Sequence, residues 1–395
     1  MQVKVKFGSS RRGSSRRFLK PITVCGLILG LTVLFCEFLI HFIVIMQCEW
    51  PVPQEPIPQP AFPQVPLTGK ALPPSSPKPI WALFLADPHI LGWGRSIWLD
   101  RLLRDWQMKR MFQAAIMVLK PHVVFILGDI FDEGFWAGPD EFDGYIVRYR
   151  SIFSHPQSTE LFVLGEKHDI GFYEDLTPFL NSEFKTEMLA PSVRKISLNE
   201  VHFVLINSML KEGNGCSLCD TIEDAIHNIV EELKCSEGNV SHCSNNTYAT
   251  KNYSRPILLQ HFSLFRESDE ICHEPDEAPN DIENDEFVQK WDCLSKEATK
   301  QLLDTFNPRL VVNRHTHHGC QTKPRENTLE ITVPSFSWRN KNNPYILLGS
   351  FTPVNYAVSK CYLTLQSTVI AIYAVIGLCL AIYFFWPFKK TTSLL

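Results

Sequence analysis

Residues 123–132 read VVFILGDIFD, a run of five apolar residues followed by a segment with glycine and two aspartates. Four other apolar runs are also followed within a few residues by His or Asp; they occupy residues 81–86, 161–164, 257–260 and 310–312. Parallel strands buried on both faces read as short apolar runs, and the active sites of α/β proteins lie at their carboxyl ends. The pattern predicts an α/β fold whose strand ends gather His and Asp side chains at one site.

The first two strand ends carry three candidate metal ligands. Asp87 and His89 stand two residues apart. An extended chain places alternate side chains on the same side, so both can face one ion. Asp129 is the predicted bridging ligand, because two ions about 3.5–4 Å apart share an oxygen. Together these residues indicate a two-metal centre.

The later strand ends add imidazoles. His261, His315 and His317 are predicted ligands, and the alternation of the last two lets each address a different ion. Oxygen and imidazole ligands suit manganese, zinc or iron, and this ligand set does not indicate a thiolate site. Two such ions would neutralise phosphoryl oxygens and activate a water for attack at phosphorus. His168 is placed to give a proton to the leaving oxygen, so it is the predicted catalytic residue.

Two apolar segments are long enough to cross a membrane. They occupy residues 22–46 and 369–386. The second would be roughly 27 Å long as a helix, close to the thickness of a bilayer core. Basic residues flank the outer end of each segment: Arg11, Arg12, Arg16, Arg17 and Lys20 before the first, and Lys389 and Lys390 after the second. The positive-inside rule therefore predicts that both chain ends lie in the cytosol.

The chain between the two spans is predicted to lie in the secretory lumen. It carries three glycosylation acceptors, at Asn239, Asn245 and Asn252. It also carries an even number of cysteines beyond the membrane border, which suits disulfides in an oxidising compartment. These cysteines are Cys216, Cys219, Cys235, Cys243, Cys272, Cys293, Cys320 and Cys361.

Composition and spans together predict a six-part organisation. The 395 residues carry a net charge of −4, so no basic field indicates nucleic acid as a partner. A proline-rich stretch after the first span favours an extended spacer. The predicted parts are a basic cytosolic end (1–21), a transmembrane helix (22–46), a lumenal linker (47–79), the globular domain (80–362), a second transmembrane helix (363–387) and a cytosolic tail (388–395).

The globular domain also contains patterns for helices, a hairpin and surface loops. In chain order we expect a helix over 97–119, a hairpin over 195–208 turned at Asn199 and Glu200, loops over 211–255 and 267–286, and a helix over 295–306. The helices follow from apolar residues at helical spacing, and the hairpin follows from two apolar runs around a short polar turn. The loops follow from their polar composition.

The order of the motifs resembles that of a known family. Asp-x-His, Gly-Asp-x-x-Asp, a Gly-to-His-Asp element, a lone His and His-x-His follow one another as in the calcineurin-like metallophosphoesterases. Three longer strings are similar to the membrane-anchored branch of that family that remodels GPI anchors: CEFLI at 36–40, ILGDIFDEG at 126–134 and VPSFSWRN at 333–340. The resemblance implies an α/β/β/α sandwich with two flanking transmembrane helices.

The resemblance also implies a function, the hydrolysis of a phosphoric ester. The family member removes an ethanolamine-phosphate branch from the second mannose of GPI anchors, with two divalent ions, of which manganese is expected and zinc or iron are the alternatives. Its substrates are GPI-anchored proteins, whose transport from the endoplasmic reticulum to the Golgi the reaction promotes. The expected location is therefore ER exit sites, the ER–Golgi intermediate compartment and the cis-Golgi, with cargo receptors of the early secretory pathway as further partners.

Two positions depart from the motifs of the family. Its third motif is Gly-Asn-His-Asp, with the Asn as a ligand, whereas residues 165–169 read GEKHD, and Glu166 is the candidate substitute ligand. Arg314 replaces the glycine before His-x-His; its guanidinium could bind the substrate phosphate, as could Arg339 and Asn340. These departures leave two alternatives open: a catalytically impaired member that binds GPI-anchored cargo, or a phosphodiesterase for another lipid-linked substrate.

Overall fold

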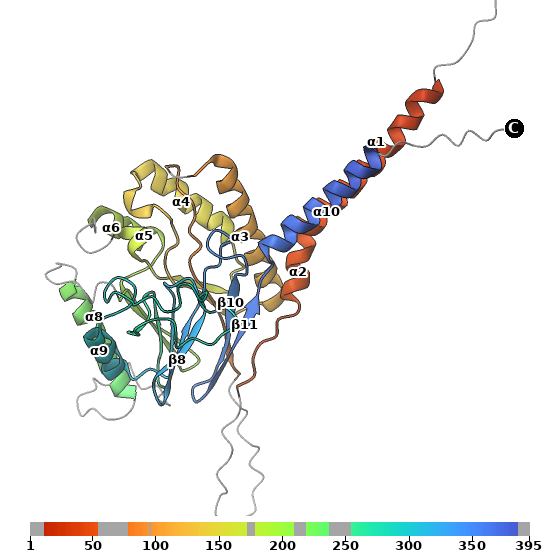
Figure 1. Cartoon of the computed structure of the whole chain (residues 1–395). Coiled ribbons are helices and arrows are strands. Elements are labelled where there is room, and N and C mark those ends of the chain that lie inside the picture. The colour runs from red at the N-terminus through yellow and green to blue at the C-terminus, as the bar shows by residue number, and fades with distance from the viewer. Residues whose placement is uncertain are drawn as a thin grey trace, which may run out of the picture.

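Two mixed β-sheets lie face to face, and helices cover the outer face of each sheet (Figure 1). The computed structural model describes residues 12–53, 78–94, 96–171, 178–208, 219–236 and 254–385. The first sheet has the strand order β11 (Tyr356–Tyr362), β10 (Tyr345–Phe351), β1 (Ile80–Leu85), β2 (Val123–Ile126), β3 (Glu160–Val163). The second has the order β4 (Val193–Leu198), β5 (Val201–Ile206), β6 (Ile257–Gln260), β7 (Leu310–Asn313), β9 (Thr328–Thr332), β8 (Cys320–Arg325).

Strand alternation explains why the sheets form two layers. In β1, Ala82 and Phe84 face the second sheet, while Leu83 and Leu85 face the helices. Successive side chains of a strand point to opposite faces, so an all-apolar strand can be buried on both sides. The two central strands β1 and β2 run parallel, as do β6 and β7. Their carboxyl ends therefore carry the segments that build the site.

The helices complete the α/β/β/α sandwich that the resemblance implies, and this fold class is confirmed. The first sheet is covered by α3 (Trp98–Leu119), α4 (Pro139–Ile152) and α6 (Pro178–Glu187), and the second by α8 (Cys219–Ser236) and α9 (Lys296–Phe306). The predicted helices over 97–119 and 295–306 are confirmed as α3 and α9. The predicted hairpin is β4 and β5, with positive φ at Asn199 and Glu200, the conformation of a type I′ turn.

The expected surface loop over 211–255 is wrong for residues 219–236, which form α8. The helix buries apolar side chains at helical spacing, including Ile222, Ile226 and Leu233, against the second sheet. Each such side chain contributes about 1.5–3 kcal/mol when fully buried. The glycine-, serine- and asparagine-rich segments on either side of this helix masked its periodicity.

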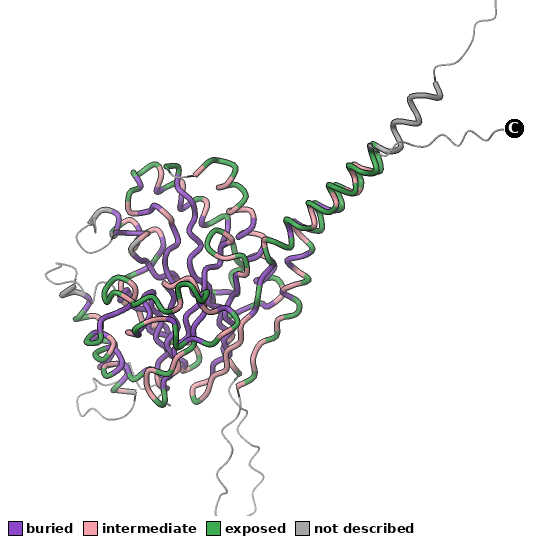
Figure 2. Tube along the Cα trace, viewed as in Figure 1, coloured by how far each residue is buried: buried purple, intermediate pink, exposed green. Residues whose placement is uncertain are grey.

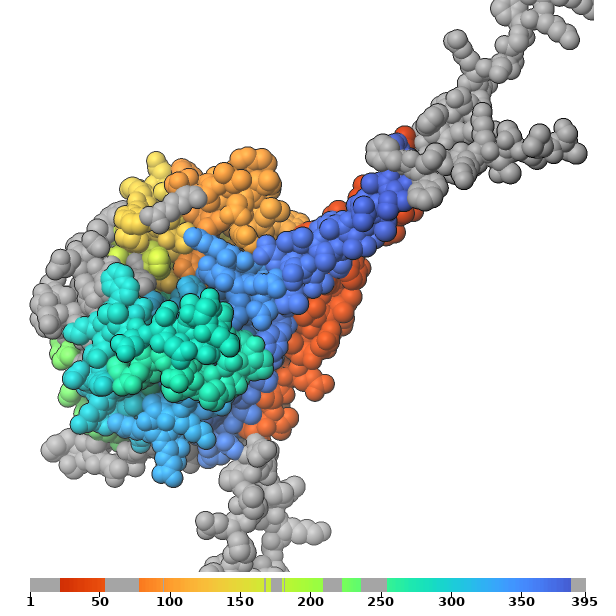
Figure 3. Space-filling model, in the orientation of Figure 1, coloured from red at the N-terminus to blue at the C-terminus, as the bar shows by residue number. Residues whose placement is uncertain are grey.

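The two predicted spans are helical and run side by side away from the sandwich (Figure 3). The first consists of α1 (Arg12–Leu34), a π-helical turn η1 (Phe35–Leu39) and α2 (Ile40–Ile45); the second is α10 (Gln366–Phe385). Much of their surface is exposed, as Figure 2 shows, and Leu27, Leu31 and Leu378 are each more than half exposed. By length and composition, residues 22–45 and 366–384 can each cross a membrane.

The pairing of the cysteines differs from the expectation. Cys48, outside the predicted set of eight, forms a disulfide with Cys361, and Cys272 pairs with Cys320. Among the described residues, Cys293 is a buried free thiol, so the even count did not reflect eight paired cysteines. The glycosylation acceptors Asn239, Asn245 and Asn252, with Cys216 and Cys243, lie outside the described residues.

Candidate metal centre

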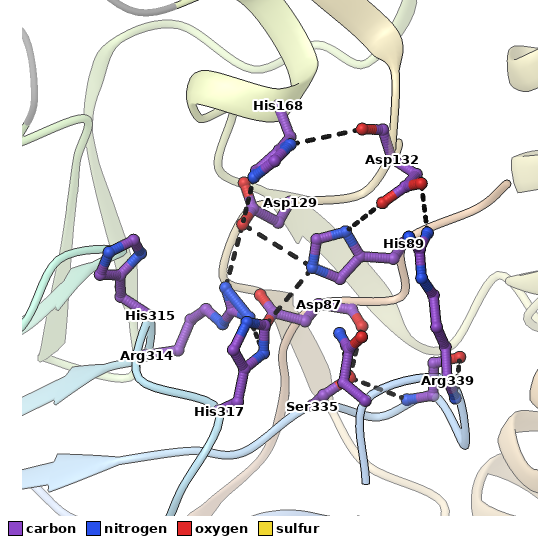
Figure 4. A network of polar contacts seen from close by, with 12 residues as sticks. Asp87, His89, Asp129, Asp132, His168, Arg314, His315, His317, Ser335 and Arg339 are labelled. Carbon is purple, nitrogen blue, oxygen red and sulfur yellow. Dashed lines mark hydrogen bonds and ion pairs between the residues drawn. The ribbon is translucent and has the colours of Figure 1, made fainter. Parts of the chain in front are cut away.

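The predicted ligands meet at the carboxyl ends of strands from both sheets (Figure 4). Asp87 and His89 follow β1, and Asp129 follows β2. On the second sheet, His261 follows β6, and the loop after β7 carries the last two ligands, His315 and His317. The structure thus joins residues that are far apart in the sequence into one cluster.

The backbone of this cluster is held in a costly conformation. Positive φ angles occur at Asp87 (52°), His89 (45°), Asp129 (48°), His315 (112°) and His317 (60°). Residues other than glycine avoid this region, and each such residue costs of order 1–3 kcal/mol. Hydrogen bonds between the loops, such as His89 N to Asp129 O at 3.1 Å, hold the conformation. Strain of this kind is typical of functional sites.

One group of three side chains, Asp87, His89 and His317, has the spacing of metal ligands. His317 Nδ1 lies 3.3 Å and His89 Nε2 lies 3.9 Å from Asp87 Oδ2. The other ring nitrogen of His89, Nδ1, lies 3.2 Å from Asp132 Oδ1. That carboxylate fixes the ring so that Nε2 faces the site, as outer partners of metal-bound histidines do.

A second group contains Asp129, His261 and His315. His261 Nε2 lies 3.6 Å from Asp129 Oδ2 and 3.3 Å from His315 Nδ1. The opposite ring nitrogens contact backbone carbonyls, of Leu127 at 3.0 Å and of Trp291 at 2.9 Å. Because a carbonyl only accepts, those nitrogens carry protons, which leaves His261 Nε2 and His315 Nδ1 to face each other. Ligands about 2.0–2.1 Å from a tetrahedral ion lie roughly 3.3–3.4 Å apart, so the facing nitrogens of His261 and His315 have the spacing of ligands to one ion. His261 and Asp129 also form a candidate ligand group with Asp87.

Arg314 occupies the centre of the first group. Its guanidinium is fully buried; Nη1 donates to Asp129 Oδ2 at 3.0 Å, and Nη2 contacts both Asp87 Oδ2 and, at 3.0 Å, His317 Nδ1. Burial lowers the pKa of Arg314. The two carboxylates that lie against the guanidinium act in the opposite direction, because they favour its charged form. With Arg314 in this position the first group does not fit a metal ion, since Asp87 Oδ2 and His317 Nδ1 are already engaged.

The backbone at position 314 does not require glycine. Among the described residues, those with positive φ do not include Arg314. The departure from the family motif therefore acts through the arginine side chain. The guanidinium faces the two carboxylates and lies away from the solvent, whereas the predicted role in binding a substrate phosphate would need it to face the substrate.

Asp169, the last residue of the third motif, is a positioning residue. Its Oδ1 accepts from the backbone amides of Ile130 and Phe131, each at 2.9 Å, and its Oδ2 accepts from Glu166 N at 3.0 Å. Burial and, after it, the charge of Asp129 raise the pKa of Asp169 well above its usual value. The side chain ties the loop after β2 to the loop after β3.

His168 lies at the open side of the cluster, in the short helix α5 (Lys167–Ile170). Its Nδ1 lies 3.3 Å from the carbonyl oxygen of Asp132, and its Nε2 lies 4.0 Å from Asp129 Oδ2. The side chain is 35% exposed, so a substrate can reach it. Glu166, the candidate substitute ligand, is fully buried beside Gly128, where a Cβ on the glycine would lie 3.0 Å from Glu166 Cβ.

The structure adds a supporting layer that the sequence reading did not assign. Asp132 holds His89 on one oxygen and pairs with Arg339 on the other. Burial favours the neutral form of Asp132, but hydrogen bonds from His89 and Arg339 outweigh it and lower the pKa of Asp132. Asn340 donates to Ser335 Oγ at 3.4 Å, and Ser335 Oγ donates to the carbonyl oxygen of Asp87 at 2.9 Å. Arg339 and Asn340 thus brace the site, and the second Asp of Gly-Asp-x-x-Asp was the available signal.

Fold and site together define a two-sheet α/β protein with an Asp- and His-rich centre that can hold divalent metal. No family model matches the chain. A relative from Gallus gallus named "Metallophosphoesterase 1" is 40% identical over 364 residues, covering 91% of this chain and 88% of that protein. One of the same name from Ailuropoda melanoleuca is 41% identical over 346 residues, covering 87% and 83%. The chain belongs to the metallophosphoesterase 1 family.

Solved structures of low sequence identity are also similar. A dimetal phosphatase from Danio rerio is 12% identical, with a TM-score of 0.41, and the match covers 73% of this chain and 99% of that one. A purple acid phosphatase from yellow lupin is 12% identical, with a TM-score of 0.45, and covers 72% and 51%.

Proposed function

We propose that this chain is a membrane-anchored, metal-dependent phosphodiesterase that removes the ethanolamine-phosphate branch from the second mannose of GPI anchors. Membership of the metallophosphoesterase 1 family and the Asp and His cluster support the hydrolysis of a phosphoric ester. The choice of substrate is supported by the motif strings at 36–40, 126–134 and 333–340. GPI-anchored proteins are then the substrates, and their export is the process served.

The observation that carries the proposal is a loop shared by the site and the base of the membrane helices. Within it, Ser335 Oγ donates to the carbonyl oxygen of Asp87, and Trp338 Nε1 donates to that of Thr364 at 2.8 Å, just before α10. Thr364 Oγ1 lies 2.9 Å from Nδ1 of His41 in α2. The metal centre is therefore fixed directly to the two helices that can cross the membrane.

A head held at the membrane favours a substrate held at the same membrane. Tethering makes their encounter effectively intramolecular and raises the local concentration of each for the other. With both chain ends in the cytosol, the site faces the lumenal side, where GPI glycans are displayed. ER exit sites, the intermediate compartment and the cis-Golgi are the proposed locations, and cargo receptors are the proposed further partners.

The chain supplies several parts of the reaction. A divalent ion bound by Asp129, His261 and His315 would provide a Lewis acid and an acidified water, with manganese proposed and zinc or iron as alternatives. His168 is partly exposed and has Nε2 4.0 Å from Asp129 Oδ2, while the carbonyl of Asp132 orients its ring. It can therefore give a proton to the mannose oxygen as the phosphorus–oxygen bond breaks.

A second candidate function is favoured by Arg314. A buried guanidinium on Asp87 and Asp129 neutralises carboxylates that would otherwise bind metal. Such a centre could recognise the phosphorylated glycan of GPI-anchored cargo and hydrolyse little of it. A third candidate keeps the hydrolysis but assigns another lipid-linked phosphodiester as the substrate.

Two measurements separate these functions. The full-length chain in detergent micelles is incubated with a GPI-anchored protein and with one metal at a time: manganese, zinc or iron. The amount of ethanolamine phosphate released is then measured. Asp129→Asn should abolish release, and Asp304→Asn, at a surface ion pair with Arg325, should not. GPI glycans from cells with and without the gene are then compared by mass spectrometry.

The outcomes point to different functions. Release in vitro, together with ethanolamine phosphate that persists on the second mannose in cells without the gene, supports the remodelling function. Binding without release favours the cargo binder. Release only from another lipid-linked phosphodiester, with unchanged GPI glycans, contradicts the remodelling role.

A further inference from the structure

The structure assigns to the guanidinium of Arg314 the place of one of the two metal ions, so that the centre holds one divalent cation beside a built-in organic cation. This inference concerns the number of ions bound and does not depend on which substrate is cleaved.

The first argument is the identity of the atoms that Arg314 contacts. Its two terminal nitrogens reach Asp87 Oδ2, Asp129 Oδ2 and His317 Nδ1. These are the acceptor atoms by which the same side chains would hold an ion. Asp87 and His317 belong to the first ligand group, and Asp129 is the predicted bridge between the two groups. One planar cation thus satisfies three acceptors that an ion would otherwise satisfy.

The second argument is steric. His317 Nδ1 and Asp87 Oδ2 are 3.3 Å apart, and an ion bound to both would lie about 2.0–2.2 Å from each. Arg314 Nη2 contacts both of these atoms. The same small volume cannot hold a nitrogen and a metal ion together. Figure 4 shows the guanidinium between Asp87 and Asp129, with His317 beside it.

The third argument is the charge of the buried cluster. Arg314, Asp87 and Asp129 are each no more than 2% exposed, so their charges are little screened by water. A guanidinium carries one positive charge, so it repels a neighbouring divalent ion half as strongly as a second divalent ion would at the same distance. The arrangement can therefore keep one ion while the other is replaced.

The fourth argument is the geometry of the second group. His261 Nε2 lies 3.3 Å from His315 Nδ1, a spacing that suits a shared ion, and 3.6 Å from Asp129 Oδ2. The ion retained is therefore the one that His261 and His315 address, with Asp129 shared between this ion and Arg314. His89 and His317 belong to the half of the centre that the guanidinium fills.

The decisive experiment counts the metal ions in the purified full-length chain. After loading with excess manganese and removal of unbound metal, elemental analysis should give one ion per chain, and electron paramagnetic resonance should show an isolated Mn²⁺. Arg314→Ala should bind two ions and show an exchange-coupled pair. Arg325→Ala removes a surface guanidinium and should still bind one.

Ligand variants provide a test that does not require Arg314→Ala to fold. In the otherwise unchanged chain, His261→Ala should lose the ion, whereas His317→Ala should keep it, because His317 faces the guanidinium. Two ions or none in the unchanged chain would overturn the inference. So would loss of the ion in His317→Ala with retention in His261→Ala, or a folded Arg314→Ala that still binds one ion.

Discussion

Arg314 Nη1 donates a hydrogen bond of 3.0 Å to Asp129 Oδ2, although the two residues are 185 positions apart in the chain. Asp129 follows β2 of the first sheet, and Arg314 follows β7 of the second, so this contact joins the two layers at the site. Both side chains are almost completely buried. Removing one partner of such a pair leaves an uncompensated charge and costs about 3–5 kcal/mol. The contact therefore links the stability of the sandwich to the chemistry of the centre.

The role of His168 predicts a variant that separates catalysis from metal binding. His168→Asn should lower kcat for phosphodiester cleavage by about 10²–10⁴-fold, because a general acid contributes that much. The number of bound ions should not change, since His168 belongs to none of the candidate ligand groups that the described residues form. Turnover and metal content are measured on the same preparation. A variant that loses its metal would show that His168 is a ligand.

Gly128 should be intolerant of a side chain for two independent reasons. Its φ is +88°, and a Cβ at this position would lie 2.7 Å from Nδ1 of His261. Gly128→Ala should cost about 1–2 kcal/mol in backbone strain and displace the imidazole from the second ligand group. We expect a clear loss in the number of ions bound per chain and a smaller proportional decrease in the unfolding temperature. Gly138→Ala, where no atom lies within 4 Å of the added Cβ, is the matched control.

His202 predicts how stability depends on pH. Burial, and then the neighbouring positive charges of Lys195 and Arg309, lower the pKa of His202 to about 4. Between about pH 6.5 and pH 4 the unfolded chain therefore binds a proton that the folded chain does not, so stability falls as the pH falls through this window. His202→Gln should remove about 1–3 kcal/mol of that loss.

The measurement is the free energy of urea unfolding between pH 7 and pH 4.5, with the full-length chain in detergent. His227→Gln on α8 is the matched control, because it makes the same substitution at an exposed position. An equal slope in the unchanged chain and in His202→Gln would contradict the prediction. At pH 7 the comparison is uninformative, because the ring is neutral in both the folded and the unfolded chain.

Trp338 links the site to the start of α10, one of the two candidate membrane spans, so its substitution should affect cleavage differently for different substrates. Trp338→Phe removes the hydrogen bond from Nε1 to the carbonyl oxygen of Thr364. One hydrogen bond contributes about 0.5–1.5 kcal/mol, so cleavage of a membrane-embedded substrate should fall by up to about tenfold. A short soluble phosphodiester should be cleaved at the original rate. Equal losses on both substrates would show that Trp338 acts only through the stability of the site.

Much of the fold was readable from local patterns. Five short apolar runs correspond to β1, β2, β3, β6 and β7 within one or two residues at their ends. Buried parallel strands are apolar on both faces, and that property is visible without knowledge of their neighbours. The ligands follow from the same patterns, because the residues after such strands must converge when the sheets form. The candidate spans are equally local, since a bilayer requires one continuous apolar segment.

Other features depended on contacts between distant segments. The direction of the Arg314 side chain depends on where Asp87 and Asp129 lie, and these residues belong to the other sheet. The partner of Cys361 is Cys48, 313 positions away, just after α2 of the first candidate span. A residue pattern reports the period and polarity of one segment, whereas side-chain direction and disulfide pairing depend on the three-dimensional approach of several. The candidate ligands could thus be named from the sequence, but the position of the Arg314 guanidinium among them depends on the packing of the two sheets.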